Sequence, residues 1–276
     1  MTQGRHEQLF QLLDITGEDA SECAELLAAS TSPGVIEALD ALSGRLGTYP
    51  PESLESAGLT EPDWIVALLR FAPQVHAYHL DLGISPEVSR AALSDFGLQL
   101  RINRRVHGRF GLDTWAWMTL HMAGNLFRLG RLQFHLIRRA QSQQHAVEQG
   151  AWVLGVHIPE DGSLSPVAVD ASFDEARRFF AAHFADKAVS EAACDSWMLD
   201  PYLLAELPES NIASFARRFT VDYCTDAPTD AVYFTFRHRG LNNLAALPRE
   251  TSLQRVVLER IDKGGTWQLG HGHLAL

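Results

Sequence analysis

The chain has 276 residues, of which 46% are hydrophobic and 21% charged, and its formal net charge is −11 at pH 7. This length suffices for one large domain or two medium ones with a sizeable core. The acidic balance argues against binding to nucleic acids or to anionic membranes, because both select clustered Lys and Arg. No stretch approaches the roughly 18 consecutive apolar residues of a membrane-spanning helix.

The cysteines and the first residues indicate where the protein works. Cys23, Cys194 and Cys224 have neither paired nor metal-type spacing, which is typical of a reducing cytosol. The opening MTQGRHEQLFQLL contains an acid and no long apolar core, so we expect no signal peptide. The sequence therefore predicts a cytoplasmic protein.

Residues 1–126 are predicted to form a helical domain. Ser32, Thr60 and Ser85 stand just before prolines at the start of apolar-periodic segments, as helix N-caps do. Gly97 is predicted to end one of these helices. A last helix is expected over residues 112–127, starting near Asp113.

Residues 127–276 are predicted to mix strands and helices. Apolar alternation predicts a strand at 128–139 and an apolar run predicts one at 151–159, with the polar residues 140–150 between them as an antiparallel connection. The helices are expected after Ser165, at 208–219 and at 251–265. Further strands are expected at 192–200, 220–224, 231–238 and 266–276. This order defines an α+β fold with one central sheet.

Several short segments along the chain resemble one known family. They resemble a bacterial group of GNAT-like acyltransferases that have a helical N-terminal domain and a GNAT-like C-terminal domain. The resemblance covers nearly the whole chain and divides it into residues 1–126 and 127–276. The matching segments are Leu129–Phe134, His157–Pro159, Cys194–Trp197, Leu199–Pro201, Ser210–Ile212 and Leu253–Arg255.

The resemblance implies an N-acyltransferase. An acyl group would pass from a thioester, either acyl-CoA or an acyl carrier protein, to an amine of a small molecule or peptide by direct attack. The strand 151–159 would diverge from the strand 192–200, and the thioester would lie in the gap. The alternative is a protein of the same shape that binds a ligand or partner without chemistry.

The loop after the strand 151–159 is the implied donor site. A helix N-terminus favours phosphate, because its free N–H groups and its dipole attract anions. The loop PEDGSLSP lacks the family's Arg/Gln-x-x-Gly-x-Gly/Ala run, and Glu160 and Asp161 would repel a pyrophosphate. Donor binding is therefore predicted at Val156, Ile158, Gly162, Ser163, Ser165 and Arg177.

His157 ends the strand and is the predicted general base, since imidazole titrates near neutral pH. A histidine that only caps the strand end is the alternative. Glu160 and Asp161 are further candidates for the base or for binding a cationic amine, against a solvated turn. Asn211 is predicted to donate a hydrogen bond to the thioester or the leaving thiolate, next to Ser210 as a helix N-cap.

The second arm of the gap is the predicted substrate-binding segment. It comprises Cys194, Asp195, Ser196 and Trp197. Cys194 as a nucleophile is an alternative to a small apolar filler. His271 and His273 share one face of the last strand, yet no metal is expected, because no Cys or carboxylate stands at ligand spacing. We expect a monomer or homodimer that binds neither nucleic acid nor membrane.

Overall fold

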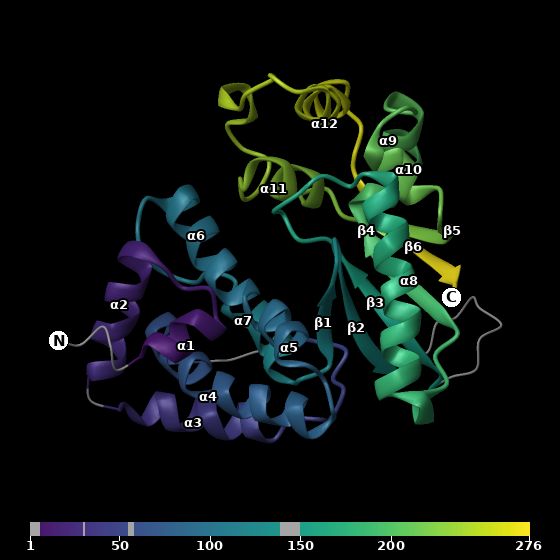
Figure 1. Cartoon of the computed structure of the whole chain (residues 1–276). Helices are drawn as coiled ribbons and strands as arrows, with labels where there is room; N and C mark the ends of the chain where they lie inside the picture. Colours follow the sequence, from purple (N-terminus) through teal and green to yellow (C-terminus); the bar gives the residue numbers. More distant parts are fainter. Residues whose placement is uncertain (1–5, 30, 55–57, 139–149) are drawn as a thin grey trace.

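The computed structural model describes residues 6–29, 31–54, 58–138 and 150–276. A helical region, purple to blue in Figure 1, lies beside a region built on one sheet. Within the described ranges, no helix combines the length and the apolar character needed to cross a bilayer. The predicted polar connection at 140–150 lies outside them, apart from Gly150.

Seven helices of the first region surround a core in which Trp64 stacks on Trp115 with ring centroids 4.6 Å apart. The predicted N-caps are confirmed: Ser32, Thr60 and Ser85 each accept a hydrogen bond from the backbone N–H three residues on. The helices are α1 (Glu7–Leu12), α2 (Gly17–Ala28), α3 (Pro33–Ser43), α4 (Glu61–Asp81), α5 (Pro86–Leu93), α6 (Asp95–His107) and α7 (Trp115–Met122).

Gly97 was expected to end a helix, and this prediction is wrong. It lies in the first turn of α6, where its backbone N–H donates to Leu13 O. A Cβ at this position would lie 2.0 Å from Asp14 O. The glycine is therefore there to let α6 approach the chain after α1, which is a packing requirement.

The second region holds a six-stranded sheet of order β1-β2-β3-β4-β6-β5. Neighbours are antiparallel except β3 and β4, which are parallel. The predicted antiparallel pairing of the strands flanking residues 140–150 is confirmed. The strands are β1 (Leu126–Leu129), β2 (Leu132–Arg138), β3 (Trp152–His157), β4 (Glu191–Ser196), β5 (Thr220–Asp226) and β6 (Gln268–Ala275).

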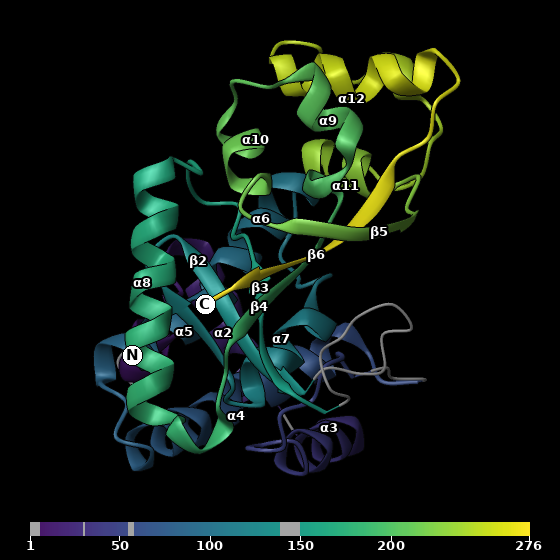
Figure 2. The same cartoon turned by 90° about the vertical axis from the view of Figure 1, so that its right-hand side faces the viewer.

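Helix α8 runs along one face of the sheet, as Figure 2 shows. Its Phe173 and Phe180 enter the core shared with β1 to β4. A smaller core around Trp197, Val257 and Trp267 joins the remaining helices at one end of the sheet. The helices of this region are α8 (Pro166–His183), α9 (Pro201–Glu206), α10 (Asn211–Ala216), α11 (Asp230–Phe236) and α12 (Ser252–Asp262), with short 3-10 turns η2 (Ala185–Lys187), η3 (Trp197–Leu199) and η4 (Leu244–Ala246).

Four element predictions need correction. Helix α7 stops at Met122, and the single strand predicted at 128–139 is the turn and second strand of a β1–β2 hairpin. Gly124 and Gly130 take positive φ values at its bends, and Asn125 Nδ2 donates to Leu136 O at 2.7 Å. The strand predicted at 192–200 ends at Ser196, where the chain enters η3. The strand predicted at 231–238 is helix α11, in which the adjacent residues Ala231 and Val232 are both buried.

Candidate active site

Strands β3 and β4 part at their carboxyl ends. Their ladder contains only the pairs Leu154↔Ala192 and Gly155↔Ala193. Beyond Gly155, β3 pairs only with β2, up to His157↔Gln133. Strand β4 continues with β6 as far as Ser196↔Gly270. The predicted divergence of these two strands is confirmed.

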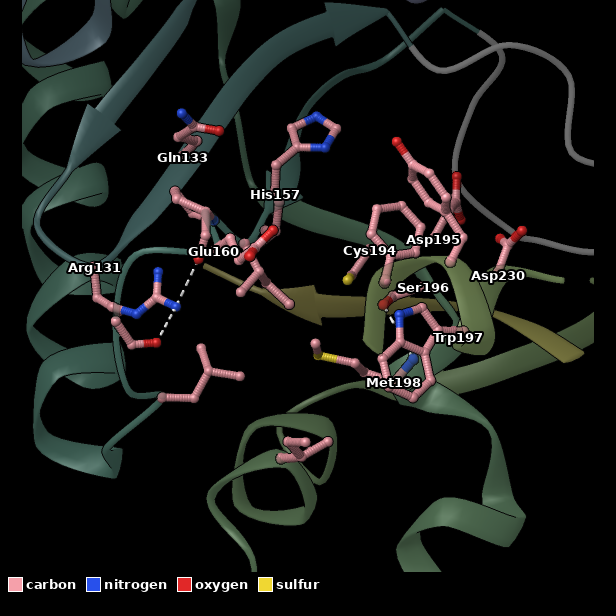
Figure 3. Close-up of a pocket in the computed structure, with 18 of the residues that line it drawn as sticks. Arg131, Gln133, His157, Glu160, Cys194, Asp195, Ser196, Trp197, Met198 and Asp230 are labelled. Atoms are coloured by element: carbon pink, nitrogen blue, oxygen red, sulfur yellow. Dashed lines mark hydrogen bonds between the residues drawn. The ribbon is translucent and has the colours of Figure 1, made fainter. Parts of the chain in front are cut away.

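A pocket of about 680 Å³ occupies the gap between the two strand ends. Figure 3 shows Arg131 on one side of it, Asp195 and Asp230 on the opposite side, and His157 between them. The helical region and the region built on the sheet both contribute to its walls, and so do the ends of β3 and β4. The lining includes Val156–Glu160 and Gly162–Leu164, Cys194–Met198, Asn211 and Ile212, Asp95, Gln99, Thr114 and Trp117, Arg131 and Gln133, and Asp230, Tyr233, Phe234 and Arg237.

His157 stands at the wall of this pocket, at the end of β3. The edge of its ring meets Trp117 with centroids 4.8 Å apart, and its Nε2 has no hydrogen-bond partner. Burial, together with the nearby His121, lowers the pKa of His157 to about 4, whereas Asp95 acts in the opposite direction. At neutral pH the imidazole is therefore uncharged and has a lone pair available to accept a proton.

The deep wall of the pocket is polar and comes partly from the helical region. Asp95 is 2% exposed. Its Oδ2 accepts from Trp117 Nε1 at 3.0 Å and from Gln99 Nε2 at 3.3 Å, and its Oδ1 accepts from Gln133 Nε2 at 3.1 Å. His121 Nε2 lies 3.4 Å from Oδ2. This network joins α6, α7 and β2 behind His157.

The loop after β3 is held by an arginine that comes from the β1–β2 turn. The Arg131 guanidinium donates to the carbonyls of Pro159 (2.8 Å), Gly162 (2.6 Å) and Ser163 (3.0 Å). Its Nη1 is buried without a partner. Arg131 therefore fixes the conformation of this loop. It also supplies a positive charge that the loop's own sequence lacks.

The two acids of this loop are also paired. Glu160 accepts from Arg105 of α6 and from Arg237 Nε, the latter at 2.7 Å. Asp161 accepts from Arg128 at 2.6 and 3.1 Å. Burial alone would raise the pKa of Asp161, but the hydrogen bonds and charge of Arg128 hold it below its usual value. The repulsion expected from these acids is offset, and both carboxylates already have cationic partners.

The β4 arm presents a buried thiol and an exposed acid. Cys194 is 1% exposed, and burial raises the pKa of its thiol well above the usual range, so it is not a thiolate at neutral pH. Asp195 lies 2.8 Å from His271 Nδ1. Ser196 Oγ accepts from Met198 N, which turns the chain into η3. Trp197 is buried edge-on against Trp267.

The start of α8 adjoins the pocket through Ser163 and Leu164. Ser165 is the N-cap of α8 without a side-chain hydrogen bond, whereas Ser210 caps α10 as predicted. Asn211 lines the pocket and its Nδ2 donates to Ser163 Oγ at 3.0 Å. Arg177, a predicted donor ligand, does not line the pocket and pairs with Asp174 at 2.8 Å.

Helix α11 supplies one wall that the sequence did not reveal, because its segment was predicted to be a strand. Burial raises the pKa of Asp230, and this carboxylate has no ion pair among the described residues. The Tyr233 ring lies 5.2 Å from the guanidinium carbons of both Arg237 and Arg239. The regular 3.6-residue spacing of Asp230, Tyr233, Phe234 and Arg237 is the signal that could have identified a pocket-facing helix.

The two histidines of β6 have separate partners. His271 lies between Asp195 and Thr225 Oγ1, and His273 Nδ1 lies 2.8 Å from Asp222. Within the described part of the chain, no three His, Cys, Asp or Glu side chains come together as metal ligands.

Two family models together account for nearly the whole chain. Residues 126–274 match the GNAT-like C-terminal domain, and residues 5–124 match the N-acyltransferase N-terminal domain. The chain therefore belongs to the GNAT-like acyltransferases with this N-terminal domain. None of the curated proteins matches the sequence.

Solved structures of acyltransferases are similar over almost the full length. An acyltransferase mutant in complex with octanoyl-CoA is 30% identical, with a TM-score of 0.86 over 99% of this chain and 88% of that one. An acyltransferase in complex with decanoyl-CoA and teicoplanin has the same identity, score and coverage. A complex with CoA and 10C-teicoplanin is 30% identical, with a TM-score of 0.86 over 98% and 87%. The predictions of a GNAT-like α+β fold and of an acyltransferase are confirmed.

Proposed function

We propose that the protein transfers an acyl group from acyl-CoA to the amine of a small molecule, with the reacting thioester between the ends of β3 and β4. The parting of these strands beyond Gly155 and Ala193, next to an uncharged His157, carries the proposal. The similar acyltransferases contain octanoyl-CoA or decanoyl-CoA, which supports CoA as the carrier of the acyl group.

The donor fits the gap by main-chain recognition. Beyond Gly155, β3 has no partner on its β4 side, so the backbone at Val156 and Ile158 is available to the pantetheine arm. The pyrophosphate would meet Gly162, Ser163 and Ser165 at the start of α8, where the helix dipole favours anions. Arg131 replaces the arginine of the missing motif and supplies a positive charge behind this loop.

The chemistry is a direct attack. The amine nitrogen forms a bond to the thioester carbonyl carbon, and His157 accepts the proton that the nitrogen loses. The tetrahedral intermediate then expels the CoA thiolate, which takes up a proton. Asn211 donates a hydrogen bond to the thioester oxygen or the thiolate, and Tyr233, which lines the pocket between two guanidinium groups, is the candidate donor of that last proton.

The acceptor binds on the side of the pocket opposite Arg131. Asp195, Ser196 and Trp197 line this side together with Asp230, whose carboxylate is suited to an ammonium group. Two of the similar acyltransferase structures contain teicoplanin or 10C-teicoplanin. We infer an amine-bearing small molecule as the acceptor class, with teicoplanin as the first compound to test.

Release of free thiol from decanoyl-CoA in the presence of an amine panel, teicoplanin included, tests the proposal. We expect amine-dependent release, and we expect His157→Ala to remove most of the turnover, by about 100-fold, while the melting temperature changes little. His238→Ala, which changes a half-buried histidine outside the pocket lining, is the control.

Three outcomes would overturn parts of the proposal. Stabilisation by decanoyl-CoA without thiol release for any amine would favour a binding protein. Release only from an acyl carrier protein would make that protein the donor. Full activity of His157→Ala would place the base elsewhere.

A further inference from the structure

We propose that Asp95 of the helical region is a positioning residue for His157, providing the negative charge that stabilises the imidazolium formed when His157 accepts the proton. This inference rests on the proposed role of His157. It concerns a residue outside the GNAT-like domain, and it assigns the helical region a part in the chemical step.

Asp95 reaches His157 through the two side chains that flank it. Gln133 is the direct cross-strand neighbour of His157, and it donates to Asp95 Oδ1 at 3.1 Å. Trp117 packs edge-on against His157, and its indole N–H donates to Asp95 Oδ2 at 3.0 Å. All four residues line the same pocket. The carboxylate is thus fixed behind the imidazole on both sides.

The charge of Asp95 is unusual among the buried acids of the described residues. Asp19, 5% exposed, pairs with Arg104, and Asp200, 1% exposed, pairs with Arg260 at 2.6 Å. Asp95 has no Arg or Lys partner in the part of the chain that the structure describes; its donors are uncharged amide and indole groups. A buried carboxylate without a cation is costly, so a structure retains it where a positive charge arrives during function.

The histidines packed around Asp95 and His157 do not supply this positive charge at neutral pH. His121 of α7 lies 3.4 Å away, but burial lowers the pKa of His121, so it stays uncharged. His135 of β2 packs against His157 with centroids 5.9 Å apart, and burial lowers its pKa as well. The cation that forms at His157 during transfer is the charge that Asp95 is placed to stabilise.

A double-mutant cycle tests this coupling with decanoyl-CoA as donor and the best amine of the panel as acceptor. We expect Asp95→Asn to lower kcat by about tenfold or more, with KM for decanoyl-CoA changed by less than about threefold. If Asp95 acts through His157, the double variant Asp95→Asn/His157→Ala is no slower than His157→Ala alone. Asp19→Asn, at a buried acid far from the pocket lining, is expected to lower the melting temperature without the loss of kcat.

Trp117→Phe keeps the ring against His157 but removes the N–H donor to Asp95, so it provides a second test if Asp95→Asn folds poorly. It is expected to lower kcat by a few-fold and to lose this effect in the His157→Ala background. Multiplicative effects in either double variant would overturn the inference, as would an Asp95→Asn effect confined to the KM of the amine. If His157→Ala is itself fully active, the assignment of the base fails first, and the cycle shows this separately.

Discussion

The two sides of the pocket use charge in different ways. On the donor side, Glu160 and Asp161 each pair with arginines from neighbouring elements, and Arg131 binds three carbonyls of the loop. On the interior side, Asp95, His121 and His135 are buried and His157 is half-buried. Among the described residues Asp95 has no arginine or lysine partner, and the three histidines are uncharged at neutral pH. The ion pairs fix the conformation of the loop, whereas the uncharged histidines of the interior side are able to accept a proton.

The comparison predicts that acid affects the interior side first. The folded-state pKa of His157 is about 4, below the value near 6.5 expected in the unfolded chain. Stability from this group is fully present above pH 6.5 and is lost as the pH falls toward 4, because only the unfolded chain takes up the proton. His157 alone accounts for about 3 kcal/mol over this window, and His135 acts in the same direction.

Urea unfolding at several pH values between 7 and 4 measures this loss. His157→Ala has no imidazole to protonate at this position, so its free energy of unfolding should fall less steeply. Parallel curves for the two proteins would show that His157 is not held uncharged in the fold.

Arg131→Met is predicted to have the next largest effect, on donor binding. Losing the cation that organises residues 159–163 should raise KM for decanoyl-CoA by about tenfold, whereas decanoyl-pantetheine, which has no pyrophosphate, should be much less affected. Arg177→Met is the matched control, because Arg177 lies on α8 outside the pocket lining and pairs with Asp174.

Equal losses with both donors would mean that Arg131 only maintains the fold of the loop. If Arg177→Met raises KM for decanoyl-CoA as much as Arg131→Met does, the phosphate binds at Arg177 on α8, as the sequence predicted.

Cys194→Ala is predicted to have the smallest effect. The thiol is buried and its pKa is raised, so it is not available as a nucleophile, and alanine leaves a slightly larger cavity. We expect kcat within about threefold of the parent and a melting temperature lower by a few degrees. A loss of activity near that of His157→Ala, or a trapped acyl-enzyme in mass spectrometry, would contradict direct attack.

Sequence reasoning located the strands and helices that frame the gap. His157 ends a continuous apolar run, and Pro166 begins an amphipathic helix, so both have local signals. The segment after Thr229 was misassigned because Val232 and the aromatic residues that follow it have high strand propensity, although the segment forms helix α11.

Asp95, Trp117 and Arg131 had no local signal of function. In the sequence, Asp95 stands just before Gly97 near the end of a predicted helix, and Arg131 lies on the polar face of the strand predicted at 128–139. Their roles depend on contacts between segments 22 or more residues apart, such as Trp117 with Asp95 and Arg131 with Pro159. Such contacts follow from the packing of the two regions, which periodicity and capping rules do not determine.

A crystal structure with decanoyl-CoA soaked in tests the proposed catalytic gap most directly. The thioester should lie between the end of β3 at Val156 and His157 and the end of β4 at Cys194 to Ser196, with the pyrophosphate at the start of α8. A donor bound anywhere else, while these two strand ends stay unoccupied, would contradict the account.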